Sequence, residues 1–370
     1  PTPPDSLSSS PPAAGLPRIH NGLPRFDQIR DGKFMEERDR YKVTYTVDPV
    51  LQTAVEDLFR SHRPPFGVFV ALEPKTGKIL ALADYSQSVE ERAIWQRATY
   101  PAASIFKLVT AAGALEKGLL RYDSPLPFRG NPYRLDSRKL LARSKNERQT
   151  NFDEALGKSN NVVFGRVAAQ ILGPQALREY SEAFQFNRAI RFDFSLDMSR
   201  ASVPEELYEV ARCGAGFGEV TLNPLHAALI GAAIANGGVM MRPYLIEGIY
   251  DPQGERIYRP QPEVWARPIS APTARNLGRM MLRTVEDGTA SRVFRRFGKD
   301  LLKKISVCGK TGSLSGDNPP GLYEWFVGFA PAAAPQIAFA AMAINHQNLK
   351  SKSTYVAQEA LRTFFREQID

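Results

Sequence analysis

One serine and one lysine in this chain are spaced so that they could act as a nucleophile and its base. Ser104 and Lys107 lie at the start of an apolar segment, 104–117, that is predicted to form a helix. Residues three apart share one face of a helix, so the hydroxyl and the amine can meet. Unpaired backbone N–H groups at a helix N-terminus also favour developing negative charge. The spacing therefore predicts a serine nucleophile.

The lysine can act as a base only in its neutral form, whereas its ordinary pKa is about 10.4. The apolar neighbours Phe106, Leu108 and Val109 predict burial, and burial lowers the pKa of a lysine. The alternative is a helix-capping Ser104 with a surface Lys107. A Ser-x-x-Lys match is expected about once by chance in a chain of this length. It occurs once here, so this motif needs support from elsewhere in the chain.

A second polar tripeptide, Ser159-Asn160-Asn161, leads directly into the apolar residues 162–164. Ser159 could relay a proton and Asn161 could hold a substrate amide. Attachment to a packed element suits a site, because rigid elements hold geometry better than loops. The alternative is an ordinary polar turn of a helix. Another Ser-x-Asn, at 144–146, lies in a highly polar run and is predicted to be a loop.

The third candidate is Lys310-Thr311-Gly312-Ser313, which follows a predicted strand over 304–308. If the chain stays extended, Lys310 and Gly312 face one way and Thr311 and Ser313 the other. Gly312 leaves space where the backbone of a ligand could approach. A second Lys-Thr-Gly, at 75–77, separates two predicted strands and is interpreted as a turn.

The elements that must position these residues follow an α+β order. Strands are predicted near both ends of the chain, at 43–47, 67–72, 78–82, 304–308, 323–330 and 336–344. Helices are predicted between and beside them, at 48–58, 104–117, 151–167, 225–235, 274–285 and 355–365, with Asp48 as the N-cap of the first. We therefore expect one antiparallel β-sheet assembled from both chain ends, flanked by helices, with a mostly helical middle subdomain.

The composition excludes several classes of protein. Lys and Arg number 48 against 39 Asp and Glu, but the basic residues are dispersed and no nucleic-acid-binding motif accompanies them. The four histidines are far apart and there are two cysteines, so we expect no metal site. Cys213 and Cys308 are either a disulfide or two buried thiols.

The first part of the chain differs in composition from the remainder. Residues 1–40 begin with a Pro/Ser-rich stretch and are predicted to be a tail or linker, and residues 41–370 to be one domain. No apolar run reaches membrane-spanning length. We expect that a membrane anchor or signal has been removed upstream.

Taken in order, the three motifs resemble those of penicillin-binding proteins and related serine β-lactamases. The similarity covers roughly residues 41–370, and Ser313 replaces the commoner threonine. Further similar segments lie at 45–52, 72–81, 216–218, 221–229, 235–238, 288–290 and 325–331. The chain is thus identified as a member of the transpeptidase-domain family.

This resemblance implies a periplasmic or extracytoplasmic peptidoglycan D,D-transpeptidase without a cofactor. Ser104 would be acylated by a stem peptide ending in D-Ala-D-Ala, and Lys107 would take its proton. Ser159 and Lys310 would protonate the leaving amine, and Asn161 would bind the peptide backbone. Thr311 and Ser313 would hold the terminal carboxylate beside Lys310, and Gly312 would leave space for the bound substrate. The backbone N–H groups of Ser104 and Ser313 would form the oxyanion hole.

The same resemblance implies partners and leaves alternatives open. β-Lactams would be covalent inhibitors, and a glycosyltransferase or proteins of the divisome or elongasome would be partners. A D,D-carboxypeptidase or a β-lactamase could carry the same motifs. For a β-lactamase, Glu205 and Glu206 only faintly match the expected acidic motif and are interpreted as helix surface. A non-catalytic, β-lactam-sensing or wall-binding scaffold is the alternative of another class.

Overall fold

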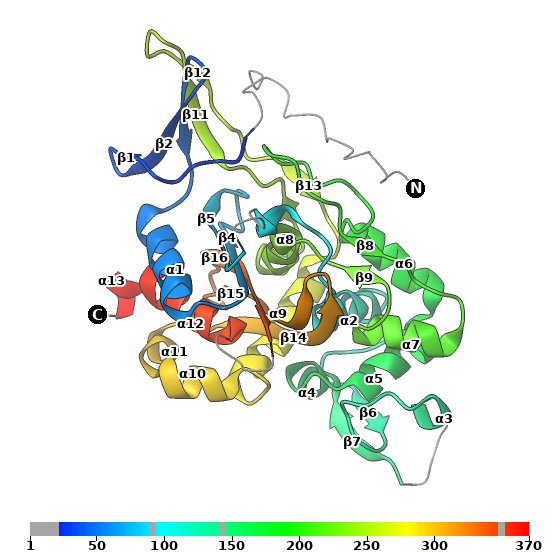
Figure 1. Cartoon of the computed structure of the whole chain (residues 1–370). Coiled ribbons are helices and arrows are strands. Elements are labelled where there is room, and N and C mark those ends of the chain that lie inside the picture. Colours follow the sequence, from blue (N-terminus) through cyan, green and yellow to red (C-terminus); the bar gives the residue numbers. More distant parts are fainter. Residues whose placement is uncertain (1–21, 89–92, 141–145, 347–351, 370) are drawn as a thin grey trace.

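A five-stranded antiparallel sheet drawn from distant parts of the sequence lies at the centre of the protein (Figure 1). The computed structural model describes residues 22–88, 93–140, 146–346 and 352–369. The strands follow the spatial order β14 (Cys308–Asp317), β15 (Pro320–Ala330), β16 (Ile337–Asn345), β4 (Phe66–Leu72) and β5 (Ile79–Ser86). The predicted α+β fold, with one antiparallel sheet built from both chain ends, is confirmed.

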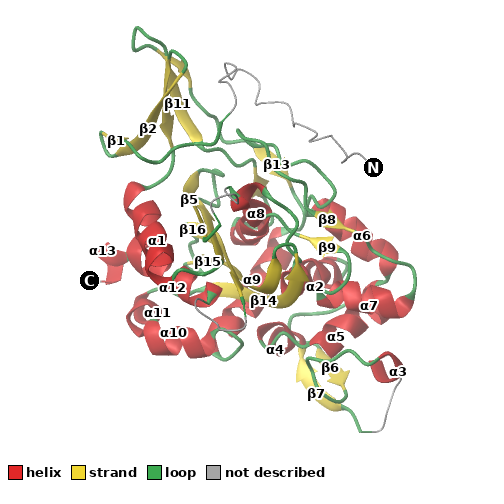
Figure 2. Cartoon of the chain, in the orientation of Figure 1, coloured by secondary structure: helices red, strands yellow, loops and turns green. Residues whose placement is uncertain are grey.

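Alternate residues of these strands pack into two apolar cores, one on each face of the sheet. Val68 and Val70 of β4 belong to one core, and Phe69 and Ala71 to the other. Helices cover both faces, as Figure 2 shows. They are α8 (Pro224–Ala235) and α9 (Ala271–Glu286) for the first face, and α1 (Pro49–His62), α10 (Ser291–Phe297) and α12 (Ser353–Phe364) for the second.

The start of α1 shows how the sequence sets these helices. The carboxylate of Asp48 accepts hydrogen bonds from the backbone N–H groups of Val50 (2.8 Å) and Leu51 (3.0 Å). Pro49 occupies the first turn, where no backbone donor is needed. The prediction that Asp48 caps this helix is confirmed.

The middle of the chain is mostly helical, as predicted, and it supplies the wall that faces the sheet. Its elements are η2 (Ala103–Phe106), α2 (Lys107–Glu116), α4 (Phe152–Gly157), α5 (Asn161–Arg166), the π-helical segment η3 (Val167–Leu172), α6 (Pro174–Ala183) and α7 (Leu207–Ala215). Two predictions differ from the structure. Ser104 lies in a 3-10 turn before α2, and the helix predicted over 151–167 is interrupted at Ser159.

Shorter elements complete the fold. Pairs of short strands are β6 (Pro125–Phe128) with β7 (Arg148–Asn151), β8 (Arg200–Ala201) with β9 (Val220–Thr221), and β10 (Met240–Met241) with β13 (Val264–Ala266). Short helices are η1 (Ile94–Gln96), α3 (Ser137–Leu140), α11 (Lys299–Lys304) and α13 (Arg366–Ile369). Of the helices described, none is long and apolar enough to cross a membrane.

A second five-stranded sheet projects from the top of the view in Figure 1. Its order is β1 (Ile29–Arg30), β2 (Lys33–Arg38), β3 (Tyr41–Tyr45), β11 (Ile246–Tyr250) and β12 (Arg256–Tyr258). The prediction of a tail over 1–40 therefore needs correction at 29–38, which forms strands; residues 1–21 lie outside the described part. Glu36 is buried there, and its carboxylate is satisfied by a hydrogen bond from Tyr45 Oη (2.8 Å) and an ion pair with Arg38.

The structure also tests the predictions made for the 75–77 turn and for the two cysteines. The segment 75–77 forms the turn between β4 and β5, as expected, with Gly77 in a left-handed conformation (φ +82°). Cys213 and Cys308 are free, buried thiols rather than a disulfide. Of the alternative Ser-x-Asn, residues 144 and 145 lie outside the described part of the chain.

Candidate active site

Ser104 and Lys107 meet at the junction of η2 and α2. Lys107 Nζ lies 2.7 Å from Ser104 Oγ, 2.7 Å from Asn161 Oδ1 and 2.5 Å from the carbonyl oxygen of Ala215. The Lys107 side chain is wholly inaccessible to solvent, and its amine lies 5.8 Å from the ring centroid of Phe164. The i, i+3 spacing therefore places both groups together although the first turn is 3-10 rather than α-helical.

The electrostatics of this position favour a neutral amine. Burial, followed by the nearby cation of Lys310, lowers the pKa of Lys107 well below its ordinary value. A neutral amine has two N–H bonds and one lone pair. The oxygens of Asn161 and Ala215 can only accept, so they take the two hydrogens and leave the lone pair for the Ser104 hydroxyl. In this arrangement the lysine can accept a proton from the serine.

Ser159 sits in the break between α4 and α5, with a left-handed backbone (φ +55°) that is uncommon outside glycine. Asn160 caps α5 through a hydrogen bond from Val163 N to its Oδ1 (3.1 Å). The next residue, Asn161, donates from Nδ2 to the carbonyl oxygen of Tyr133 at 2.9 Å. The break thus turns Ser159 and Asn161 towards the cleft while the flanking helices fix their backbone.

The third motif lies within β14, which runs from Cys308 to Asp317. The strand predicted over 304–308 is therefore wrong except at Cys308, because α11 extends to Lys304. Lys310 is fully buried, and its Nζ donates to Ser159 Oγ at 2.9 Å and to the carbonyl oxygen of Thr311 at 2.7 Å. Burial lowers the pKa of Lys310 to about 7. Close to neutral pH this amine therefore exists in both protonation states, which suits a group that carries a proton.

Gly312 has a second reason to lack a side chain besides the approach of a ligand. A Cβ there would lie 3.2 Å from Ile105 Cγ1 and 3.4 Å from Ala103 Cβ, so its absence lets η2 approach β14 closely. This contact brings the turn that carries Ser104 against the strand that carries Lys310.

The three motifs border one cavity of about 490 Å³. Ser104, Ser159, Asn161, Thr311, Gly312 and Ser313 line it, and the amines of Lys107 and Lys310 reach the serine hydroxyls from behind. The structure therefore brings together all eight residues singled out in the sequence.

Other lining residues were not identified as site residues from the sequence. The 288–290 segment was noted only as a family resemblance, yet Thr289 Oγ1 lies 2.5 Å from Thr311 Oγ1, and Thr289 N donates to Gly157 O at 3.1 Å. Tyr133 stands in a polar stretch and gave no sequence signal, although it is 56% exposed at the edge of the cavity. Further lining residues are Phe217, Arg292, Val293, Glu324, Trp325, Lys352, Ser353 and Thr354.

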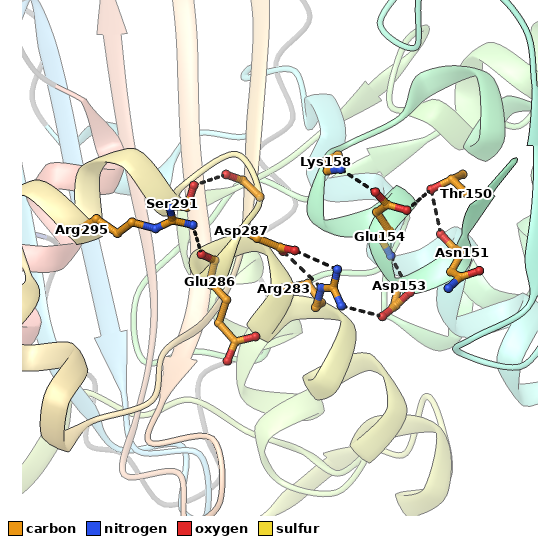
Figure 3. Close-up of polar contacts among 11 residues, drawn as sticks. Thr150, Asn151, Asp153, Glu154, Lys158, Arg283, Glu286, Asp287, Ser291 and Arg295 are labelled. Atoms are coloured by element: carbon orange, nitrogen blue, oxygen red, sulfur yellow. Dashed lines mark hydrogen bonds and ion pairs between the residues drawn. The ribbon is translucent and has the colours of Figure 1, made fainter. Parts of the chain in front are cut away.

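A network of charged side chains joins the helix before Ser159 to the turn that carries Thr289 (Figure 3). Arg283 of α9 lies 3.6 Å from a carboxylate oxygen of Asp153 in α4 and 2.8 Å from one of Asp287. Within α4, Glu154 pairs with Lys158. A Cβ at Gly288 would lie 2.2 Å from Gly157 O, so the two segments touch through backbone. The network fixes the second motif relative to the turn beside the third.

The acidic pair considered for a β-lactamase lies immediately before α7, which begins at Leu207, rather than on the helix surface predicted for it. The carboxylate of Glu206 accepts from Tyr208 N and Glu209 N and caps α7, while Glu205 pairs with Arg178. Both carboxylates are therefore committed to local structure.

The fold and the three motifs together define a known class of protein. A family model described as the penicillin binding protein transpeptidase domain matches residues 67–366, and the chain belongs to this family.

Among its relatives is the peptidoglycan D,D-transpeptidase PbpA of Mycobacterium tuberculosis, which is 30% identical over 342 residues, or 82% of this chain and 67% of PbpA. The crystal structure of PBPA from M. tuberculosis superposes with a TM-score of 0.73 at 26% identity, covering 87% of this chain and 81% of that one. The D,D-transpeptidase domain of a peptidoglycan glycosyltransferase from Eggerthella lenta gives 0.72 at 28% identity, covering 88% and 83%.

Proposed function

We propose that this protein is a peptidoglycan D,D-transpeptidase that forms an acyl-enzyme at Ser104. PbpA, its relative, is named a peptidoglycan D,D-transpeptidase, and the M. tuberculosis protein has been captured as a penicillin G acyl-enzyme. The observation that carries the proposal is the buried amine of Lys107, 2.7 Å from Ser104 Oγ.

In the first step, Ser104 Oγ bonds to the penultimate carbonyl carbon of a peptide ending in D-Ala-D-Ala, and its proton passes to Lys107. The carbonyl oxygen becomes an oxyanion, which the backbone N–H groups of Ser104 and Ser313 would stabilise. Each such donor contributes about 2.7 to 4 kcal/mol in comparable enzymes. The C–N bond then breaks and the terminal D-Ala departs as a free amine.

The leaving amine needs a proton, and Ser159 is placed to supply it from Lys310, whose amine lies 2.9 Å away. Thr311 and Ser313 would hold the terminal carboxylate beside the Lys310 cation. Asn161 would bind the donor's backbone amide. An acceptor amine then attacks the acyl-enzyme, releases Ser104 and completes the transfer. A β-lactam would enter as a mimic of the donor and leave Ser104 blocked.

Product analysis separates transfer from hydrolysis. The protein is incubated with a peptide ending in D-Ala-D-Ala and an excess of an amine acceptor, and the products are separated by mass. We expect the acceptor amide as the main product and none from Ser104→Ala. The free acid as the sole product would indicate a D,D-carboxypeptidase, and rapid turnover of penicillin G would indicate a β-lactamase.

The proposed activity also implies where in the cell the protein acts and which proteins it acts with. Action on peptidoglycan stem peptides implies work on the extracytoplasmic side of the membrane, in the periplasm where one exists. A glycosyltransferase that supplies nascent glycan, within the division or elongation machinery, is the kind of partner such an enzyme would need. Co-purification of this protein with a membrane-bound glycosyltransferase tests that part separately from the chemistry.

A further inference from the structure

A second cavity, of about 820 Å³, adjoins the active-site cavity. Tyr133 and Phe217 line both, so these two aromatic side chains stand at the boundary between them. The other walls come from the segment 129–140, from Val162 of α5, and from Tyr208 and Arg212 of α7. We call this space the arginine-lined cavity, because Arg129, Arg134 and Arg212 line it.

The wall of this cavity is attached directly to the second catalytic motif. Asn161 N donates to the carbonyl oxygen of Pro132 at 2.7 Å, and Asn161 Nδ2 donates to that of Tyr133 at 2.9 Å. On the far side of the same segment, Arg148 donates to the carbonyl oxygen of Gly130 at 2.5 Å. The segment that carries Arg129 and Arg134 is therefore held at a fixed place beside Asn161.

The charge of the cavity is positive and partly uncompensated. Arg212 is paired, 3.2 Å from a carboxylate oxygen of Glu209. Arg129 and Arg134 are exposed, and neither forms an ion pair within the described part of the chain. Among the described lining residues, Asp136 is the acidic one, and it already has an interaction partner. Two guanidinium groups are thus available to an anionic ligand.

The direction of the bound peptide leads its upstream part towards this cavity, and this step rests on the proposed function. If Thr311 and Ser313 hold the terminal carboxylate and Ser104 attacks the next carbonyl, the preceding residues must extend from Ser104 into the rest of the active-site cavity. Tyr133 and Phe217 line the same cavity as Ser104 and Asn161, and Asn161 Nδ2 is hydrogen-bonded to the carbonyl oxygen of Tyr133. The arginine-lined cavity begins there.

We propose that the arginine-lined cavity binds the upstream part of the acyl-donor peptide, and that Arg129 and Arg134 recognise a free carboxylate on it. Guanidinium groups suit this role because their planar donors match a carboxylate in a bidentate geometry. An exposed ion pair contributes little overall, so selection between an acidic and a neutral donor should be about fivefold rather than absolute.

Two matched donor peptides test this proposal. Both end in D-Ala-D-Ala, and they differ only in whether the side chain of the preceding residue ends in a carboxylate or a carboxamide. The measurement is kcat/KM for release of D-alanine from each. We expect the unmodified protein to prefer the carboxylate about fivefold, and the double variant Arg129→Ala/Arg134→Ala to lose this preference. Arg129→Lys/Arg134→Lys should retain part of it, because the charge remains.

Arg275→Ala serves as the matched control, since Arg275 is an exposed arginine of α9 that lines a different cavity. It should leave both rates and their ratio unchanged. Equal kcat/KM values for the two donors on the unmodified protein would overturn the proposal, as would a preference that survives in the folded double variant. Acylation by penicillin G is recorded in parallel on the unmodified protein, so that a failure of Ser104 chemistry is distinguished from a failure of donor selection.

Discussion

Lys107 Nζ lies 2.7 Å from Ser104 Oγ, and its two other hydrogen-bond partners in the described chain, Asn161 Oδ1 and Ala215 O, can only accept. The lone pair of a neutral lysine in this position therefore points to the serine hydroxyl. Burial supplies the second condition, because it lowers the pKa of Lys107 well below its ordinary value and so favours the neutral amine.

Two substitutions of Lys107 distinguish the effect of its neutral amine on catalysis from the effect of its size. Lys107→Ala should slow acylation of Ser104 by about 10² to 10⁴-fold, the usual contribution of a general base. Lys107→Arg should be equally slow, because a guanidinium stays protonated. The second-order rate constant for acylation by penicillin G is the measurement, and Lys117→Ala, at the end of the same helix, is the control. An arginine variant with nearly the original rate would contradict a base role.

The two buried lysines predict a bell-shaped pH profile of kcat/KM for a donor peptide. The acid limb reflects protonation of Lys107, whose pKa is lowered by burial and by Lys310. The basic limb should fall as pH rises through about 7, where Lys310 loses the proton that its proposed role requires. Lys310→Arg keeps a cation and should remove the basic limb. Activity that keeps rising with pH to the ordinary pKa of lysine, about 10.4, would contradict this assignment.

Lys310 should also destabilise the fold at neutral pH. Its pKa is about 7 when folded, below the ordinary value of 10.5, so the unfolded state binds more protons between these pH values. Its contribution to the free energy of unfolding therefore rises with pH from about 7 to about 10. Lys310→Met should be more stable by roughly 2 kcal/mol at neutral pH, with a smaller rise of stability towards alkaline pH.

Urea unfolding of both proteins at several pH values between about 6 and 9 checks that prediction. A methionine variant that is less stable at neutral pH, with an unchanged pH dependence, would show that Lys310 carries no desolvation penalty.

Thr289 should position Thr311 through its hydroxyl, 2.5 Å away. Thr289→Val keeps the shape and removes the hydrogen bond, so kcat/KM should fall about fivefold, in line with roughly 1 kcal/mol for one hydrogen bond. Thr289→Ser should retain the activity. The kcat/KM for a donor peptide and the melting temperature are measured for both variants. Equal activity of the valine and serine variants would show that the hydroxyl does not act through Thr311.

The sequence predicted the candidate site better than the local geometry that builds it. Ser104, Ser159 and Lys310 could be assigned to one site because their motifs occur in a family-specific order, although Lys310 follows Ser159 by 151 positions. The break at Ser159 could not be seen, because nothing in its residue type requires a positive φ. Ser159 joins α4, which packs against α9, to α5, which packs against α7, and these tertiary contacts are not visible in the sequence.

Contacts between distant segments account for the other differences. Lys33–Arg38 has two adjacent apolar residues, Phe34 and Met35, followed by three charged ones, and so lacks the alternation of a strand. It becomes a strand because β3 pairs with it and with β11, which lies about 200 residues further along. Thr289 likewise could be assigned to the site only from the structure, in which its hydroxyl contacts that of Thr311 on β14. Single-sequence patterns carry no information on such pairings.

The most direct test of the account is the intact mass of the protein after incubation with penicillin G. The unmodified protein should gain the mass of one penicillin molecule per chain in a stable adduct, which peptide mapping should place on Ser104. Ser104→Ala should show no adduct, while its folding is checked by circular dichroism. No adduct on the unmodified protein, or an adduct that persists in folded Ser104→Ala, would contradict Ser104 as the nucleophile.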